Sequence, residues 1–203
     1  MVDTHDTAAQ ARPLRSDARR SIDAILNAAR TLLGERSDAS IEEIAAEANV
    51  TRQTVYAHFA SRDALIAALI EAAAAEYAVL LDAAGLDTAP PAEALAQFLD
   101  AGWQFLRRYP LLLDPTARVP RPTCNDPHDV VPPRLARLIR RGQRAGDFDR
   151  TFPPAWLAAA VIGLQHTAAA EITAGHLTAR KAAALCLESA LRLCGSSRPK
   201  ESP

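Results

Sequence analysis

Apolar positions recur with a helical period along most of the chain. Ile22, Ile25, Leu26, Ala29 and Leu33 stand at i, i+3, i+4, i+7 and i+11, the spacing that makes one apolar stripe on an α-helix. Comparable stripes predict further helices over about 41–48, 51–59, 61–84, 91–108, 134–144, 154–174 and 178–194. The pattern therefore predicts an all-α protein of about nine helices in total.

Local signals mark where some of these helices begin and end. Ser40 and Glu43 form the Ser-x-x-Glu pattern of a capping box, in which each side chain accepts a hydrogen bond from the other residue's backbone N–H. Asn49 suits a tight turn because asparagine tolerates the left-handed conformation, and Thr51 is a good N-cap for the helix that follows. Six prolines between residues 114 and 133 predict a long loop there.

Composition agrees with the helical pattern. The 203 residues include 44 Ala and 24 Leu, both strong helix formers. Residues 1–16 and 196–203 lack an apolar pattern, and we expect a disordered arm and a disordered tail. The N-terminus has no apolar core of a secretory signal, and no stretch of about 18 uncharged apolar residues predicts a membrane span. We therefore expect a cytoplasmic protein with no membrane partner, whose three cysteines are free thiols.

Two short helices joined by a three-residue turn, within residues 40–62, form the pattern of a helix-turn-helix. In this motif the second helix enters the major groove of DNA. The apolar residues Ile44, Ala45, Val50, Val55 and Phe59 are expected to hold the two helices together. Although the net charge of the chain is −1, the segment 49–62 contains two arginines and no acidic residue. The motif predicts double-stranded DNA as a partner.

The side chains expected to face outward from the second helix suit DNA recognition. Arg52 can bind guanine O6 and N7 through two hydrogen bonds, and Gln53 can bind adenine N6 and N7 in the same way. Hydroxyl groups and backbone amides at the start of the helix can bind phosphate oxygens. The predicted DNA-binding residues are Ser40, Thr51, Arg52, Gln53, Thr54, Tyr56, His58 and Arg62. Four further arginines between residues 10 and 22 predict additional contacts of the N-terminal arm with phosphates or the minor groove.

The region from Ser21 to about Leu69 resembles the DNA-binding domain of the tetracycline-repressor (TetR) family. The segment AAEANVTRQTVYAHFASRDAL is similar to that family's signature across the turn and the recognition helix. Two departures are Asn49, where the family commonly has Gly, and Arg62, where it commonly has Lys. The resemblance implies a homodimeric repressor that binds a palindromic operator and is released by an unidentified small molecule. It also implies a DNA-binding domain over 17–64, followed by a ligand-binding and dimerisation domain over 65–195.

Aromatic and polar residues in the second half are candidates for the small-molecule site. Trp103 and Trp156 could line a pocket with Phe98 and Phe105, although aromatics at helical spacing are more often ordinary core residues. His166 is the fifth candidate, because a polar group on an apolar helix must find a hydrogen-bond partner. A core or subunit-interface role for His166 and its neighbour Gln165 is the favoured alternative.

The last two helices, 154–174 and 178–194, are apolar nearly all round. A helix of this kind is buried on more than one side. One side of each helix would pack within the chain, and we expect the other side to form a homodimer interface. The alternative is that these helices lie at the centre of their own bundle.

Other function classes have less support from the sequence. The chain contains no nucleophile elbow, glycine-rich phosphate loop or His-Glu-x-x-His motif, so we expect neither an enzyme nor a bound cofactor. Cys124 and His128 have a spacing that metal ligands can have, but without further ligands nearby we interpret it as a coincidence. The main alternative function is a helical small-molecule-binding or protein-interaction module whose helix-turn-helix no longer binds DNA.

Overall fold

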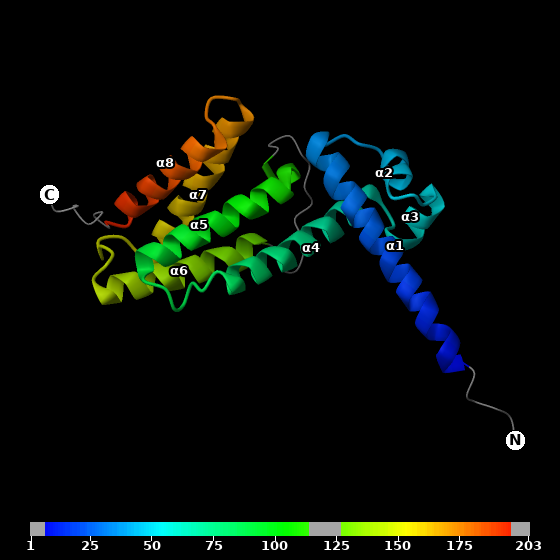
Figure 1. The fold of residues 1–203 in the computed structure, drawn as a ribbon, viewed down its shortest axis with the longest axis horizontal. Helices are drawn as coiled ribbons and strands as arrows, with labels where there is room; N and C mark the ends of the chain where they lie inside the picture. Colours follow the sequence, from blue (N-terminus) through cyan, green and yellow to red (C-terminus); the bar gives the residue numbers. More distant parts are fainter. Residues whose placement is uncertain (1–6, 114–126, 196–203) are drawn as a thin grey trace, which may run out of the picture. The chain divides into compact units, whose positions relative to one another are not determined.

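The computed structural model describes the backbone of residues 7–113 and 127–195 and the side chains of 17–112 and 131–195. Within these residues it contains eight α-helices, one 3₁₀ helix and no β-strand (Figure 1), so the all-α prediction is confirmed. The helices are α1 (Thr7–Glu35), α2 (Ile41–Glu47), α3 (Arg52–His58), α4 (Arg62–Ala83), α5 (Pro91–Arg108), the 3₁₀ helix η1 (Pro110–Leu113), α6 (Pro127–Ala145), α7 (Pro154–Thr173) and α8 (Ala179–Leu193).

The chain divides into two compact units. The first contains α1, α2 and α3, the part of α4 up to Ile70, and η1. In this unit α1 packs on α2 and on η1, and α2 packs on α3 (Figure 1). Its core is made of the apolar side chains that the stripes predict, among them Ile25, Leu33, Ile44, Val55 and Leu65.

Helix α1 begins earlier than the sequence predicts. Its backbone is helical from Thr7, whereas the apolar stripe starts near residue 22 and an irregular arm is expected up to residue 16. The first buried side chain among those described is Ile25. Seven of the ten residues 7–16 are Ala, Arg, Leu or Gln, which favour helix, and Pro13 is the exception. Adding residues to an existing helix is much easier than nucleating one. Once the packed part of α1 has formed, residues 7–16 can therefore extend it toward the N-terminus. Residues 1–6 and the predicted tail 196–203 lie outside the described residues.

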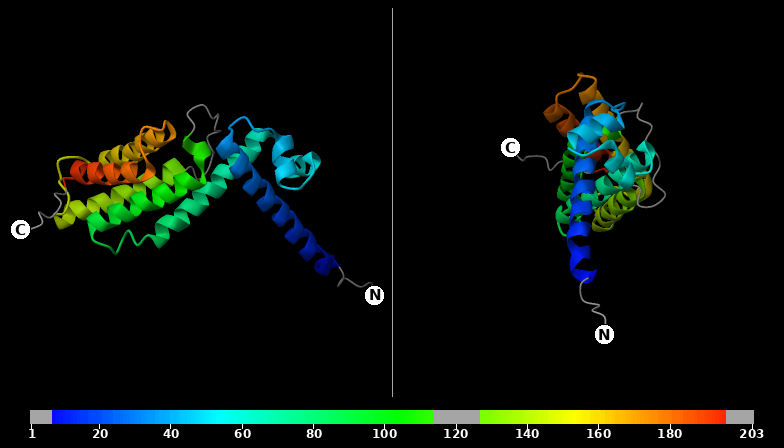
Figure 2. Two further views of the ribbon diagram at one scale, coloured as in Figure 1. Left: turned by 45° about the horizontal axis from the view of Figure 1, so that its top comes forward. Right: turned by 90° about the vertical axis from the view of Figure 1, so that its right-hand side faces the viewer.

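The second unit contains α4 from Glu71 onward and the helices α5, α6, α7 and α8. Within it α6 packs on α7, α7 on α8, and α5 on both α6 and α8. The left-hand view of Figure 2 shows α8, in red, beside α5, in green. The side chains of Phe98, Leu135, Leu138, Ile139 and Leu157 are fully buried at its centre.

Helix α6 is one element whose start the sequence misplaces. The prolines of 114–133 predict a loop up to Arg134, but the backbone is helical from Pro127, with Pro132 and Pro133 inside the helix. Proline in a helix loses one backbone hydrogen bond. Burial of Val131, one turn before the buried Leu135, offsets this loss by extending the apolar stripe of α6. Residues 114–126 of the predicted loop lie outside the described residues.

A buried amide fixes how α5 and α7 cross. Gln165 is 5% exposed, and its Nε2 donates a hydrogen bond to the carbonyl oxygen of Leu99 at 2.8 Å. Gly102 leaves room for this side chain, since a Cβ atom there would lie 2.4 Å from Gln165 Oε1. The expectation that Gln165 is a satisfied core residue is confirmed.

Helix α4 is long and apolar enough to span a membrane by length and composition. Two glutamates, Glu71 and Glu76, interrupt its sequence. Leu65, Ile66 and Leu69 of α4 are buried in the first unit, and Tyr77 and Leu81 in the second. Packing within the chain therefore accounts for these five residues of α4, whereas Val79 of the same helix is exposed.

Candidate nucleic-acid interface

Helices α2 and α3 form the predicted helix-turn-helix. Asn49 adopts the left-handed conformation with φ of 54°, and the Val50 N–H donates a hydrogen bond to the Ala45 carbonyl at 3.0 Å. Ala45 and Val55 are buried, at 3% and 0% exposure. The turn is therefore tight and the two helices pack closely, as the sequence predicts.

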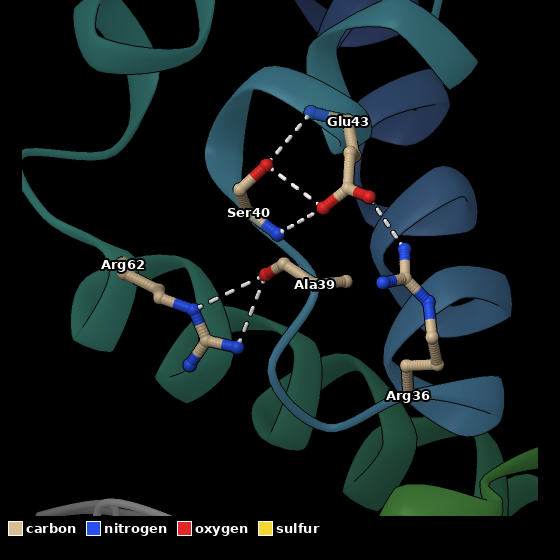
Figure 3. Close-up of polar contacts among 5 residues, drawn as sticks. All are labelled: Arg36, Ala39, Ser40, Glu43 and Arg62. Carbon is tan, nitrogen blue, oxygen red and sulfur yellow. Dashed lines mark hydrogen bonds and ion pairs between the residues drawn. The ribbon is translucent and has the colours of Figure 1, made fainter.

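The predicted capping box starts α2. The Glu43 N–H donates to Ser40 Oγ at 3.2 Å, while the backbone N–H and the hydroxyl of Ser40 donate to Glu43 Oε2 at 2.7 and 2.8 Å. Arg36, just after α1, donates to Glu43 Oε1 at 2.5 Å (Figure 3). Hydrogen bonds from the Ser40 backbone, Arg36 and the Ser40 hydroxyl, in that order, lower the pKa of Glu43 to about 2. The Ser40 side chain, predicted as a DNA contact, is thus engaged in a helix cap.

Arg62, at the start of α4, points back toward the segment between α1 and α2. Its Nη2 donates to the Ser37 carbonyl at 2.6 Å. Its Nη2 and Nε also donate to the Ala39 carbonyl, at 3.2 and 3.4 Å (Figure 3). The side chain is half-buried. Arginine donates in several directions at once, so this residue ties the start of α4 to two carbonyls of the segment between α1 and α2. The sequence predicts only its possible contact with phosphate.

Thr51 caps α3 as predicted. Its Oγ1 accepts a hydrogen bond from the Thr54 N–H at 3.1 Å, and the two threonine hydroxyl oxygens lie 2.8 Å apart. The cap satisfies one of the free N–H groups at the helix start.

The exposed residues of α3 are Arg52, Gln53, Tyr56 and Ala57, while Thr54 and His58 are half-buried. Tyr56 is 41% exposed, which is high for a large aromatic residue. The guanidinium carbon of Arg52 lies 5.3 Å from the centroid of the Tyr56 ring, close enough for a cation–π interaction. One face of α3 therefore presents a cation, an amide and a phenol together, near the start of the helix.

The sequence alone gives no indication of one contact in this surface. Arg52 Nη1 forms an ion pair with Glu42 Oε1 at 2.5 Å, and Glu42 lies in the first turn of α2. Tyr56 and then Glu42 raise the pKa of Arg52 above its ordinary value. The acid-free segment 49–62 thus has a carboxylate beside it that comes from the other helix of the motif.

The small-molecule candidates do not come together in this structure. Phe98, Trp103 and Phe105 are buried on α5, and the Phe105 ring stacks on Tyr77 with centroids 4.3 Å apart. Trp156 is 62% exposed.

Trp156 and His166 lie on the exposed side of α7. The opposite side of this helix, with Leu157, Val161 and Gln165, packs into the bundle. Trp156 and His166 therefore do not line a common site with the α5 aromatics in the single chain, because α7 turns them away from its own core.

No group of three potential metal ligands lies together among the described residues. Cys124 falls outside them, and the side chain of His128 is likewise not described.

Comparison with known proteins agrees with this architecture. Residues 25–69 match the family model described as bacterial regulatory proteins, tetR family. No curated protein sequence matches the chain. Among solved structures, the fatty acid degradation regulator FadR from Bacillus halodurans is similar over 89% of this chain and 97% of its own, with a TM-score of 0.70 and 17% identity.

Two ligand-bound structures are similar as well. FadR from Bacillus subtilis, in complex with stearoyl-CoA, is 15% identical over 86% of this chain and 98% of its own, with a TM-score of 0.69. The regulator LfrR from Mycobacterium smegmatis, in complex with proflavine, is 21% identical over 85% of this chain and 94% of its own, with a TM-score of 0.64. At these identities the likeness concerns the fold. The likeness to these solved structures covers 85–89% of the chain, and residues 25–69, which contain the helix-turn-helix, are a domain of the tetR family of bacterial regulatory proteins.

Proposed function

We propose that this protein is a ligand-responsive transcriptional regulator that binds a palindromic operator as a homodimer. It acts in the cytoplasm as a repressor, without catalytic activity or a cofactor, and a small molecule releases it from DNA. The observation that carries the proposal is the exposed face of α3, where Arg52, Gln53 and Tyr56 stand on a helix-turn-helix.

This face suits the major groove. Arg52 and Gln53 are the side chains best able to distinguish base pairs, by paired hydrogen bonds to guanine and adenine. Tyr56, Thr51, Thr54 and His58 are proposed to contact the phosphate backbone, which fixes the position of the helix in the groove. Such contacts make binding strongly dependent on salt.

Ser40 and Arg62 are proposed to act mainly by holding the segment that precedes α2. Their hydrogen bonds within the domain support this role. Groups held in this way keep the start of α2 in place, and a rigid scaffold reduces the entropy lost when the protein binds.

The N-terminal part of α1 is proposed to extend the DNA contact. Arg12, Arg15 and Arg19 stand at i, i+3 and i+7 of this helix, the spacing that brings residues to one stripe. Each phosphate contact that such a stripe makes would add to the salt dependence of binding.

The homodimer is proposed to form through α7 and α8. The apolar residues Trp156, Ala159 and Gly163 recur along the exposed side of α7, and Leu185 of α8 is 46% exposed. Helices α7 and α8 pack against each other, and we propose that these residues contribute to one dimer interface. A two-fold dimer would present two copies of α3 to two half-sites about 34–36 Å apart.

The effector is proposed to bind among the helices of the second unit, beside the α5 aromatics Phe98, Trp103 and Phe105. The complexes of the similar proteins with proflavine and stearoyl-CoA support an organic molecule with a substantial apolar part. Its binding would alter the spacing of the two recognition helices and favour the state that does not fit the operator.

The decisive experiment is selection of genomic DNA fragments by the purified full-length protein. We expect fragments that share an inverted repeat, bound more weakly by the double variant Arg52→Ala, Tyr56→Ala. The matched control Arg137→Ala removes an exposed arginine from α6 and is expected to leave operator affinity unchanged. Failure to enrich any fragment, with or without candidate ligands, would instead favour an interaction or small-molecule-binding module that does not bind DNA.

A further inference from the structure

Arg52 of the recognition helix is held from two sides. On one side Glu42 of α2 contacts its Nη1 at 2.5 Å. On the other, the Tyr56 ring of α3 lies 5.3 Å from its guanidinium carbon. The two helices of the motif thus both contribute to the position of one guanidinium group.

The Arg52 guanidinium stays accessible to solvent although Glu42 and Tyr56 both contact it. The Arg52 side chain is 60% exposed and the Glu42 side chain 54% exposed. An arginine carries five N–H donors, so a carboxylate bonded at Nη1 leaves donors for a second acceptor. Paired donors are the requirement for bidentate binding of guanine O6 and N7.

We propose that Glu42 is a positioning residue that sets base specificity, because it holds Arg52 in the orientation that contacts a guanine. The inference rests on the proposed function and adds to it a specificity determinant outside the recognition helix.

Two physical effects lead to this role. A free arginine side chain has large rotamer entropy, and a pre-organised guanidinium loses less of it when the hydrogen bonds form. A carboxylate beside Arg52 also repels phosphate oxygens, which discourages Arg52 from leaving the base for the backbone. Glu42 should therefore weaken non-specific binding while it strengthens discrimination between base pairs.

Helix α2 supplies a matched control for the charge. Glu47 is also exposed, and it lies five residues after Glu42 and thus on a different side of the helix. Glu47→Gln removes the same charge from the same helix without removing the partner of Arg52. Glu42→Asp keeps the charge but shortens the side chain, so it tests geometry alone.

The experiment compares duplexes selected from a random pool by the full-length wild type, Glu42→Gln, Glu42→Asp, Glu47→Gln and Arg52→Ala. Melting curves first verify that each variant is folded. Affinities are then measured for the selected operator, for the operator with the guanine replaced, and for an unrelated duplex at matched salt.

We expect the wild type to prefer guanine at one position of each half-site and Arg52→Ala to lose this preference. Glu42→Gln and Glu42→Asp should each reduce it about tenfold, the discrimination that one bidentate contact supplies. Glu47→Gln should retain it. Affinity for unrelated DNA should rise with both glutamine variants and stay constant with Glu42→Asp.

Two results would overturn the inference while the proposed function stands. One is an unchanged guanine preference in both Glu42 variants. The other is a specific operator whose base preferences do not depend on Arg52. If the wild type selects no sequence at all, the proposed function itself fails and the inference fails with it.

Discussion

Gly102 and Gln165 decide how closely α5 and α7 approach in the second unit. Alanine at position 102 would place its Cβ inside contact distance of the buried amide. We expect Gly102→Ala to lower the free energy of unfolding by about 1–3 kcal/mol, as overpacked core substitutions do. Urea denaturation of the full-length protein measures this change.

A double-mutant cycle checks that the effect comes from this contact. Gln165→Ala removes the amide and its hydrogen bond to Leu99, so it should destabilise the protein by itself. The double variant should be less destabilised than the sum of the single variants, by about 1 kcal/mol. Additive effects would show that Gly102 is required for some other reason.

Glu43 gives the stability of the first unit a defined dependence on pH. Its pKa in the folded protein is about 2, compared with an ordinary value of 4.5. The stabilisation it provides is therefore fully present above its ordinary pKa and is lost as the pH falls toward 2. We expect the melting temperature of the wild type to fall more steeply over this acidic range than that of Glu43→Gln.

Glu47→Gln is the control for general charge effects in this titration. It removes a carboxylate from the same helix, outside the capping box. If its melting temperature follows the same acid dependence as that of Glu43→Gln, the capping network does not account for the difference.

At the scale of elements, the turn between α2 and α3 depends on one backbone conformation. Asn49 has φ of 54°, where side chains other than Asn, Asp and Gly meet a steric cost of about 1–2 kcal/mol. We expect Asn49→Ala to lower the free energy of unfolding by about 1 kcal/mol. Asn49→Gly should have little effect. Denaturation of both variants tests this, and equal stabilities would argue against backbone strain.

The sequence predicts elements well where their signals are local. The capping box of Ser40 and Glu43, the Thr51 cap and the Asn49 turn each depend on residues at most a few positions apart. The prediction of helix ends from sequence fails where contacts between residues far apart in the chain determine the end. The early start of α6 depends on burial of Val131. Pro132 and Pro133 mislead the prediction, because two adjacent prolines are typical of a loop. The start of α1 at Thr7 depends on the later part of the same helix, from Ile25 onward, which packs in the core of the first unit.

At the scale of the whole molecule, the exposed apolar residues of α7 and α8 predict self-association. We expect the wild type to sediment as a dimer. Replacing Trp156 and Leu185 together with Glu should raise the dimer Kd by at least about tenfold, because large apolar residues at the centre of an interface contribute most of its energy. Analytical ultracentrifugation over a range of concentrations measures this.

Val79 provides the matched control for the dimer. It is 67% exposed and apolar but lies on α4. Val79→Glu should leave the dimer Kd unchanged. A monomeric wild type, or an equal effect of Val79→Glu, would contradict an interface made by α7 and α8.

The amino-acid sequence by itself determined that the protein is all-α, that α2 and α3 form a helix-turn-helix, and that Arg52, Gln53 and Tyr56 face outward. These features follow from periodicity and short-range hydrogen bonds, which are encoded by neighbouring residues. Only the tertiary structure decided that Glu42 holds Arg52, that Arg62 binds the Ser37 and Ala39 carbonyls, and that Trp156 faces away from Phe98. Those outcomes depend on how helices cross and rotate against each other, because packing sets which side of each helix meets a neighbour.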